Sequence, residues 1–181
     1  MFNYGSFKLL LLKVFIGIFL ICFSLFLFVS IYTYNPNDPG IGRLVGKSEI
    51  TNFFGFWGAF FSSIFITLYG QASFLLVIFF SYLGIFIFLG IVLKRLFLKI
   101  LLILLSVTLI NISLLHQQSF ETDSGLLSKV LFDIYKSYFP LLVNNLLYRS
   151  LSIICFTLIS IILFFYCFFI NISFFKKIVL N

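Results

Sequence analysis

The sequence predicts an all-α polytopic membrane protein with four transmembrane helices, a short interfacial or re-entrant helix and an amphipathic helix in an outer loop. Three observations predict this class. Hydrophobic residues make up 62% of the 181 residues and charged residues 9%, which leaves too few charges to solvate a soluble globule. The apolar runs are continuous, whereas the strands of a membrane β-barrel alternate in polarity over about ten residues. The basic residues stand in small groups beside these runs, as topology signals do.

The first span is expected at 14–32, an uncharged run that follows Lys8 and Lys13. The run is longer than the core of an export signal and no small-x-small cleavage site follows it, so we expect it to remain uncleaved. The span must end at Asn35-Pro36 and Asp38-Pro39, because each proline lacks a backbone donor and pushes the residue before it out of the helical region.

The second uncharged region, 50–93, is too long for one crossing at about 20 residues per span. Its best break is Tyr69-Gly70-Gln71, where glycine tolerates the dihedral angles of a turn and glutamine is costly to bury. We therefore expect a short interfacial or re-entrant helix at 57–69 and the second span at 71–93.

The third and fourth spans are expected at 96–115 and 151–174. The third needs Lys99 to extend its ammonium back to the headgroups while its stem stays in apolar surroundings. His116, at the end of this span beside two glutamines, is expected to be an interfacial, hydrogen-bonded side chain rather than a catalytic one. The cysteines fall inside apolar runs without a CxxC pair, which favours a packing role over a disulfide or a zinc site.

An amphipathic helix is expected between the third and fourth spans. Leu127, Leu131, Ile134 and Tyr138 share one face of it, Asp123 or Ser124 can cap its start, and Pro140 ends it. It is expected on the outer membrane surface, either as a plain connector or as a partner-binding helix.

Charge gives only a weak indication of topology. With four spans and both termini in the cytoplasm, the outer loops are 33–70 and 116–150, and seven basic residues lie inside against five outside. A five-span arrangement with the N-terminus outside gives the same count, so charge does not decide between them.

The segment after the first span reads Tyr34-Asn35-Pro36-Asn37-Asp38-Pro39-Gly40, and it is followed by Thr51-Asn52-Phe53-Phe54-Gly55-Phe56-Trp57-Gly58-Ala59 and by Gly70. In order and spacing these residues resemble the N-terminal four-transmembrane (4TM) domain of the FtsK/SpoIIIE DNA translocases. The resemblance implies a single 4TM domain over 1–181 and favours four spans over five. The sequence also departs from the family pattern, because Ser62 and Ser63 stand where relatives commonly carry a small residue and an acid. The residues that the resemblance marks for structural or interaction roles are Asn35, Pro36, Asp38, Pro39, Asn52, Gly55, Gly58, Ala59 and Gly70.

The resemblance implies a membrane anchor, without catalysis or cofactor, that tethers a cell-division and chromosome-segregation complex at the septum of a bacterial inner membrane. Membrane lipid, divisome membrane proteins and, if a hexameric motor is attached, further copies of the chain are the partners it implies. The sequence reaches Asn181 without a motor domain, so a fragment of a translocase and a motor-less relative both stay open. The alternative function is a small multi-pass channel or carrier subunit with a re-entrant element near Gly70.

Direct binding of ATP or nucleic acid by this segment is not expected. The stretch from Gly42 to Ser48 looks like a phosphate-binding loop, but three residues separate Gly42 from Gly46 where the motif needs four, and no strand precedes it. The formal charge of +7 resides in groups that flank membrane spans, which favours topology signals over a nucleic-acid surface.

Overall fold

The computed structural model describes residues 4–42, 50–91, 93, 95–116 and 124–169. All regular elements within these ranges are helical, which confirms the predicted all-α membrane fold. Four helices are long and apolar enough to cross a bilayer by length and composition, counting α2 to α3 as one unit. The stretch 42–48 that looks like a phosphate-binding loop lies outside the described residues except for Gly42.

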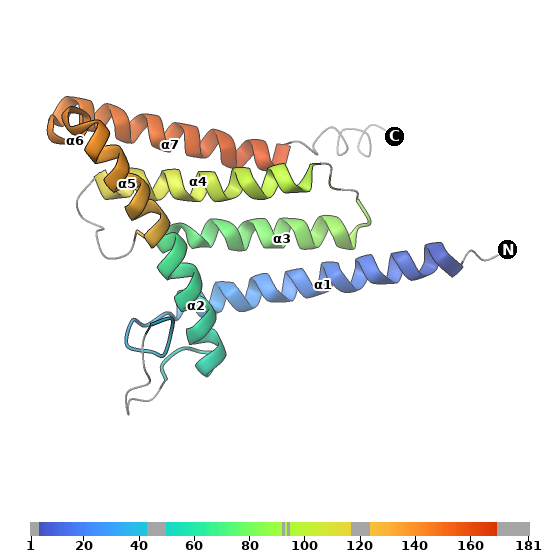
Figure 1. Ribbon diagram of the computed structural model, residues 1–181. Helices are drawn as coiled ribbons and strands as arrows, with labels where there is room; N and C mark the ends of the chain where they lie inside the picture. The colour runs from blue at the N-terminus through green and yellow to red at the C-terminus, as the bar shows by residue number, and fades with distance from the viewer. Residues whose placement is uncertain (1–3, 43–49, 92, 94, 117–123, 170–181) are drawn as a thin grey trace.

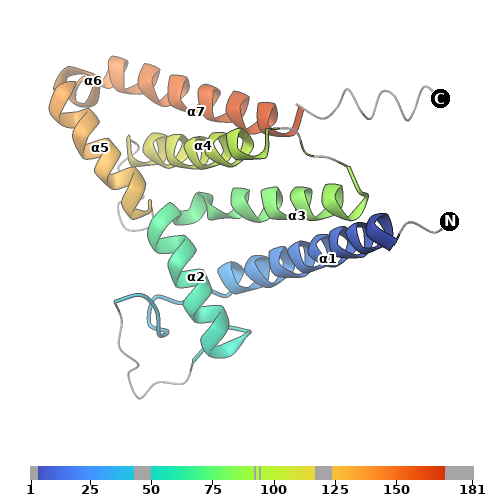
Figure 2. The ribbon, with the colours of Figure 1, turned by 45° about the vertical axis from the view of Figure 1, so that its right-hand side comes forward.

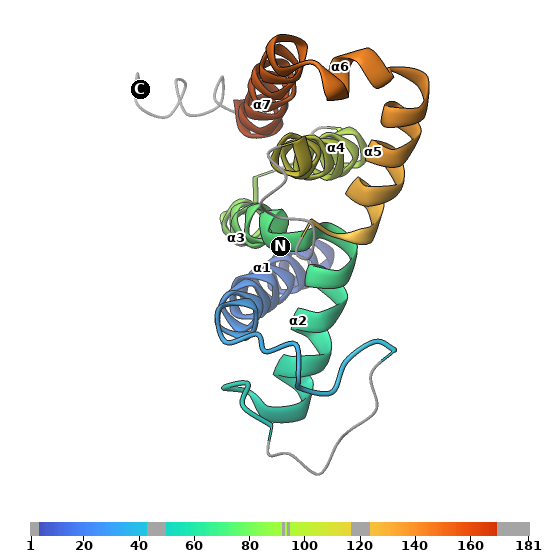
Figure 3. The same ribbon diagram turned by 90° about the vertical axis from the view of Figure 1, so that its left-hand side faces the viewer.

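The membrane-crossing helices stand side by side in one row (Figures 1 and 3). The row runs from α1 (Tyr4–Tyr32) through α3 (Phe74–Phe88) and α4 (Leu96–His116) to α7 (Leu146–Phe169). Half of the most apolar stretch of α4 is buried, against 11% of that of α7. The row therefore has α4 inside it and α7 at its edge, where apolar side chains face outward as lipid requires.

Two shorter helices run across one end of the row, one after the other (Figures 1 to 3). These are α2 (Gly55–Tyr69) and α5 (Leu126–Tyr138), and the short α6 (Pro140–Asn144) leads from α5 to α7. We call this end the capped end. The opposite end, where α1 begins and α7 ends, we call the terminal end.

The second span is shorter than the sequence predicts. A 3-10 turn, η1 (Gly70–Ser73), joins α2 to α3, and α3 ends at Phe88 instead of continuing to residue 93. Gly90, at a φ of 72°, ends the helix, because this left-handed conformation favours glycine and stops the helical path. Together η1 and α3 reach roughly 30 Å, which suffices for the hydrocarbon core.

Small and hydroxyl side chains hold the neighbouring spans together. A Cβ on Gly17 of α1 would stand 2.6 Å from the backbone nitrogen of Phe88, so glycine permits the close approach of α1 and α3 that lipid-embedded helices favour. In α4 and α7, Ser106 and Ser160 each donate a hydrogen bond to the other's carbonyl oxygen, at 2.9 and 2.8 Å. Apolar side chains from α3, α4 and α7 fill the core between these contacts.

Candidate interaction site at the capped end

The loop that leaves α1 begins with a turn fixed by its own side chain. The Asn35 Oδ1 atom accepts a hydrogen bond from the backbone N–H of Asn37 at 2.9 Å, the local bond that makes asparagine a turn former. The Asn35 amide nitrogen donates to the Thr51 hydroxyl at 3.0 Å. The turn that ends α1 is thereby joined to a strip of chain sixteen residues later.

Asp38 is the centre of this connection. Its carboxylate accepts hydrogen bonds from the backbone N–H groups of Thr51 and Asn52, both at 2.9 Å, and from the Thr51 hydroxyl at 3.1 to 3.2 Å. Only 5% of Asp38 is exposed. These donors therefore take the place of the water molecules that the carboxylate loses on burial. The carboxylate fixes the chain before α2 against the chain after α1.

Asn52 continues the connection into both helices. Its amide nitrogen donates to the carbonyl oxygens of Ser30 at 2.8 Å and Thr33 at 3.3 Å, two of the carbonyls that the end of α1 leaves unpaired. Its Oδ1 atom accepts from the N–H of Phe54 at 3.2 Å. We call Asn35, Asp38, Thr51 and Asn52 the Asp38 clamp, since together they tie the end of α1 to the start of α2.

Residues without large side chains make room for the clamp. A Cβ on Gly58 would collide with the Asn52 side-chain oxygen, and one on Gly40 would collide with the Ser63 hydroxyl. Ser63 is buried and accepts a hydrogen bond from the Ile41 N–H at 3.0 Å. Ala59 is also buried, at 2% exposed. The first turns of α2 thus lie directly against the loop.

A second junction joins α2 to the other helix pair. Gly70 and Gly125 both have positive φ angles, 62° and 75°, and a Cβ on Gly125 would stand 2.5 Å from the Gly70 backbone nitrogen. Asn111 of α4 donates a hydrogen bond to the carbonyl oxygen of Tyr69. The end of α2 therefore meets both α4 and the start of α5, and the two short helices form one continuous cap (Figure 3).

Comparison with known proteins adds the observation that decides the family. The family model described as the 4TM region of DNA translocase FtsK/SpoIIIE matches residues 10–176. This chain belongs to that family. No curated protein and no solved structure matches the chain.

The residues that the FtsK resemblance marked lie at two places in the structure. Gly70 stands at the junction with α5, and the remainder lie in or beside the Asp38 clamp, with Pro39 buried and Gly55 at a φ of 57°. Sequence reasoning missed Ser30, Thr33 and Asn111, which contribute through backbone carbonyls or from a distant helix. Thr51 could have been found, because it directly precedes Asn52 in the segment that resembles FtsK.

Two polar side chains of this FtsK-family domain lie where the sequence did not predict them. Lys99 is completely buried, and its ammonium donates to the Tyr82 hydroxyl at 2.8 Å instead of reaching the headgroups. His116 is 1% exposed and neither ring nitrogen has a hydrogen-bond partner among the described residues, whereas an interfacial, hydrogen-bonded ring was expected. Neighbouring helices cover both positions. The ring of Phe132 in α5, for example, stands 4.9 Å from that of His116.

The predicted helix cap of α5 is also different. The N-cap position is Gly125, without a side-chain hydrogen bond, and the hydroxyl of Ser124 is buried with no partner in the part of the chain that the structure describes. Asp123 lies outside the described residues. Leu127, Leu131, Ile134 and Tyr138 remain exposed on one side of the helix. The packed side instead carries Ser128, Phe132 and Tyr135, so much of the apolar face of α5 stays exposed.

The chemistry available at the capped end is hydrogen bonding and apolar contact. Within the described ranges no group of three or more histidine, cysteine or acidic residues is placed to hold a metal ion. Cys22 and Cys155 are exposed and Cys167 is buried, each as a free thiol. The Asp38 carboxylate is already committed to three donors of the clamp. The arrangement is suited to holding loops in a fixed shape.

Proposed function

We propose that this chain anchors an FtsK-like translocase in the bacterial inner membrane and tethers a cell-division and chromosome-segregation complex at the septum, with no catalytic step of its own. The family match over residues 10–176 carries the proposal. The fixed loops of the capped end support it, because a docking surface gains affinity when its shape is set before the partner arrives.

The proposal places both termini in the cytoplasm, as the resemblance to the FtsK family implies. Lys8 and Lys13 lie at the terminal end of α1, whereas Asp38 and Asp133, the acids among the described residues, lie at the capped end. Arg95 and Lys99 also lie towards the terminal end, but Lys129, Lys136 and Arg149 lie at the capped end, so the positive-inside rule supports a cytoplasmic terminal end only weakly. Divisome membrane proteins would then meet the cap or the exposed sides of the row.

Aromatic side chains on the cap provide a surface for such contacts. Phe53 is 72% exposed and Trp57 64% exposed, directly beside the Asp38 clamp. Large aromatic residues are enriched at protein interfaces and at the membrane–water boundary, since they combine an apolar body with a polar edge. The clamp holds these residues in place. Its loss would free Phe53 and Trp57 from their fixed positions while the membrane-spanning helices stay folded.

The test is the location of a fluorescently tagged full-length gene product in dividing cells. We expect enrichment at the septum and defective septation or chromosome partition on depletion. Asp38→Ala should remain in the membrane fraction and lose septal enrichment, whereas Asp133→Ala, which removes an exposed acid of α5, should retain it. An even distribution of the unaltered protein, together with normal division after depletion, would exclude the proposed role.

Self-association is part of the proposal if a hexameric motor is attached. The native thiols of Cys22 in α1 and Cys155 in α7 are exposed on the two outer helices of the row. A membrane-permeable thiol cross-linker should therefore produce oligomers in native membranes, and replacing both cysteines by serine should abolish them. Exclusively monomeric protein after efficient thiol labelling would contradict contact through these helices.

The channel alternative receives less support from the geometry. It required a re-entrant element near Gly70, but α2 lies across the capped end and does not turn back into the row (Figures 1 and 3). Gly70 is committed to the junction with Gly125. The anchor function is therefore the one that the described residues favour.

A further inference from the structure

A notch opens between α1 and α3 at the terminal end. The two helices touch at Gly17 and Gly84, where added Cβ atoms would meet the neighbouring helix within 2.6 to 3.0 Å. Beyond this contact α3 ends at Phe88, while α1 continues to Tyr4. Helix α3 does not extend over this part of α1, and the early turns of α1 and the end of α3 line an open hollow of about 520 Å³.

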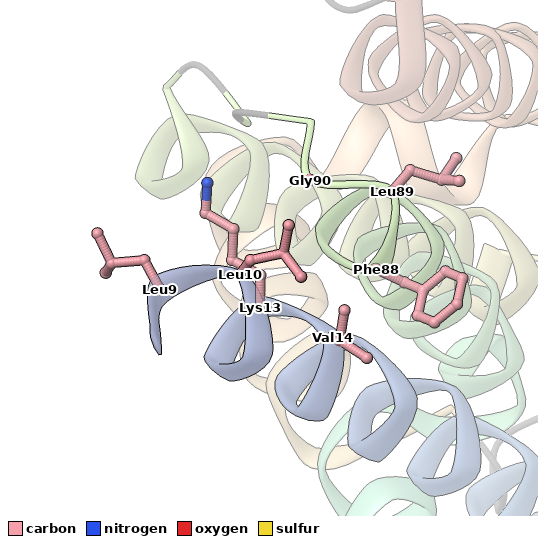
Figure 4. A pocket seen from close by; sticks show the side chains of 7 residues that line it. All are labelled: Leu9, Leu10, Lys13, Val14, Phe88, Leu89 and Gly90. Atoms are coloured by element: carbon pink, nitrogen blue, oxygen red, sulfur yellow. The ribbon is translucent and has the colours of Figure 1, made fainter. Parts of the chain in front are cut away.

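The walls of the notch are apolar and carry one cation. Figure 4 shows Leu10, Lys13 and Val14 of α1 on one side and Phe88, Leu89 and Gly90 on the other. No carboxylate of the described residues pairs with Lys13, because Asp38 and Asp133 both lie at the capped end. The lining combines an ammonium that has no carboxylate partner among the described residues with a hydrocarbon surface.

The depth of Lys13 in the bilayer limits which ligands can bind in the notch. The uncharged run 14–32 of α1 is roughly 28 Å long as a helix, close to the thickness of the hydrocarbon core. Lys13 therefore lies where acyl chains meet headgroups, and the notch opens at the same level. A ligand that fits must present a negative charge at this boundary and an apolar chain directly beside it.

We propose that the notch is a binding site for one anionic phospholipid, with its phosphate at Lys13 and an acyl chain running inward against Val14 and Phe88. The volume lies within the range of about 300–1,000 Å³ in which proteins hold small ligands. A basic residue near the membrane surface favours an anionic lipid by about fivefold. The complementary charge and the apolar wall distinguish this position from the lipid-facing sides of the row.

Native mass spectrometry of the full chain from nanodiscs made of equal amounts of phosphatidylcholine and phosphatidylglycerol tests the site. We expect phosphatidylglycerol to be retained about fivefold over phosphatidylcholine, and Lys13→Gln to abolish this preference. Lys8→Gln removes the same charge from the same helix outside the notch and should leave the preference intact. Equal losses in the two variants, or no loss in either, would overturn the proposal.

A second pair of variants tests the apolar wall without altering charge. Leu10→Trp should fill the notch and reduce the retained phosphatidylglycerol, whereas Leu12→Trp, which is equally exposed but does not line the notch, should not. The same effect in both would contradict a defined site. Soluble glycerol phosphate added in excess should leave the lipid in place, and displacement by it would identify a phosphate site in place of a phospholipid site.

Discussion

Removing the Asp38 carboxylate should release the loop between α1 and α2 while the spans remain folded. In Asp38→Ala the N–H of Asn52, a residue 4% exposed, loses its acceptor in a place that water does not reach, at a cost of about 1–3 kcal/mol. The N–H and hydroxyl of Thr51 also lose theirs, but Thr51 is exposed, so water replaces much of that contribution. We expect a total loss of about 2–4 kcal/mol in the stability of the capped end.

Trp57 makes this loss measurable at the place where it occurs. It is the single tryptophan of the chain and lies in the first turn of α2, five residues after Asn52. Denaturant titrations in detergent micelles would compare Trp57 fluorescence, which reports the clamp, with circular dichroism, which reports all helices. Asp38→Ala should shift the fluorescence transition to lower denaturant, and Asp133→Ala should leave it unchanged. If the unfolding free energies from Trp57 fluorescence of Asp38→Ala and of the unaltered protein agree within about 0.5 kcal/mol, the usual effect of a surface substitution, the role given to the carboxylate is refuted.

Three further outcomes follow from contacts between helices. Tyr82→Phe should destabilise the domain by about 1–3 kcal/mol, because the Lys99 ammonium then stays buried without its acceptor. In a Lys99→Met background the same change should cost little, and equal costs in the two backgrounds, measured by unfolding titrations, would contradict the pairing. Ser106→Ala and Ser160→Ala should each cost about 0.6–1 kcal/mol, and a double-mutant cycle should show coupling between them, whereas additive losses would mean that the reciprocal bonds contribute nothing. Gly125→Ala should cost about 1–3 kcal/mol through its positive φ and its approach to the α2 backbone, and an unchanged unfolding midpoint would show that the cap junction is not tightly packed.

The sequence was sufficient to predict the helical class because each helix needs only its own residues to be recognised. Long uncharged runs predicted membrane-spanning helices, the resemblance to FtsK favoured four of them over five, and Tyr69-Gly70-Gln71 predicted the break that η1 makes after α2. The end of the second span was missed, because Ile91 to Leu93 continue the apolar run beyond Gly90 and hydropathy alone does not detect the positive φ that ends the helix.

The side-chain partners could be predicted only in part, since each depends on segments that are distant in the sequence. Asn35-Pro36 and Asp38-Pro39 predicted where α1 ends, but not that Asp38 accepts bonds from residues 13 and 14 positions later. The errors at Lys99 and His116 have one cause. Both expectations treated a helix as surrounded by lipid and headgroups, whereas adjacent helices occupy those sides and bury the two groups.

The positions of the polar contacts explain why the residues that resemble FtsK gather at the capped end. A helix that crosses a bilayer satisfies its own backbone, but a chain that turns at the surface exposes carbonyl and N–H groups that need other partners. At the capped end α1 stops, α2 lies across the row and α5 meets α2. Asp38 and Asn52 supply the partners there, the glycines at 58 and 125 permit the close approach, and Gly70 adopts the positive φ of the turn. The interior of a span needs only apolar side chains of suitable size, and many sequences provide them. A fixed pattern of asparagine, aspartate, proline and glycine is required only where the backbone leaves the helical path, and that is where sequence similarity within such a family can remain detectable.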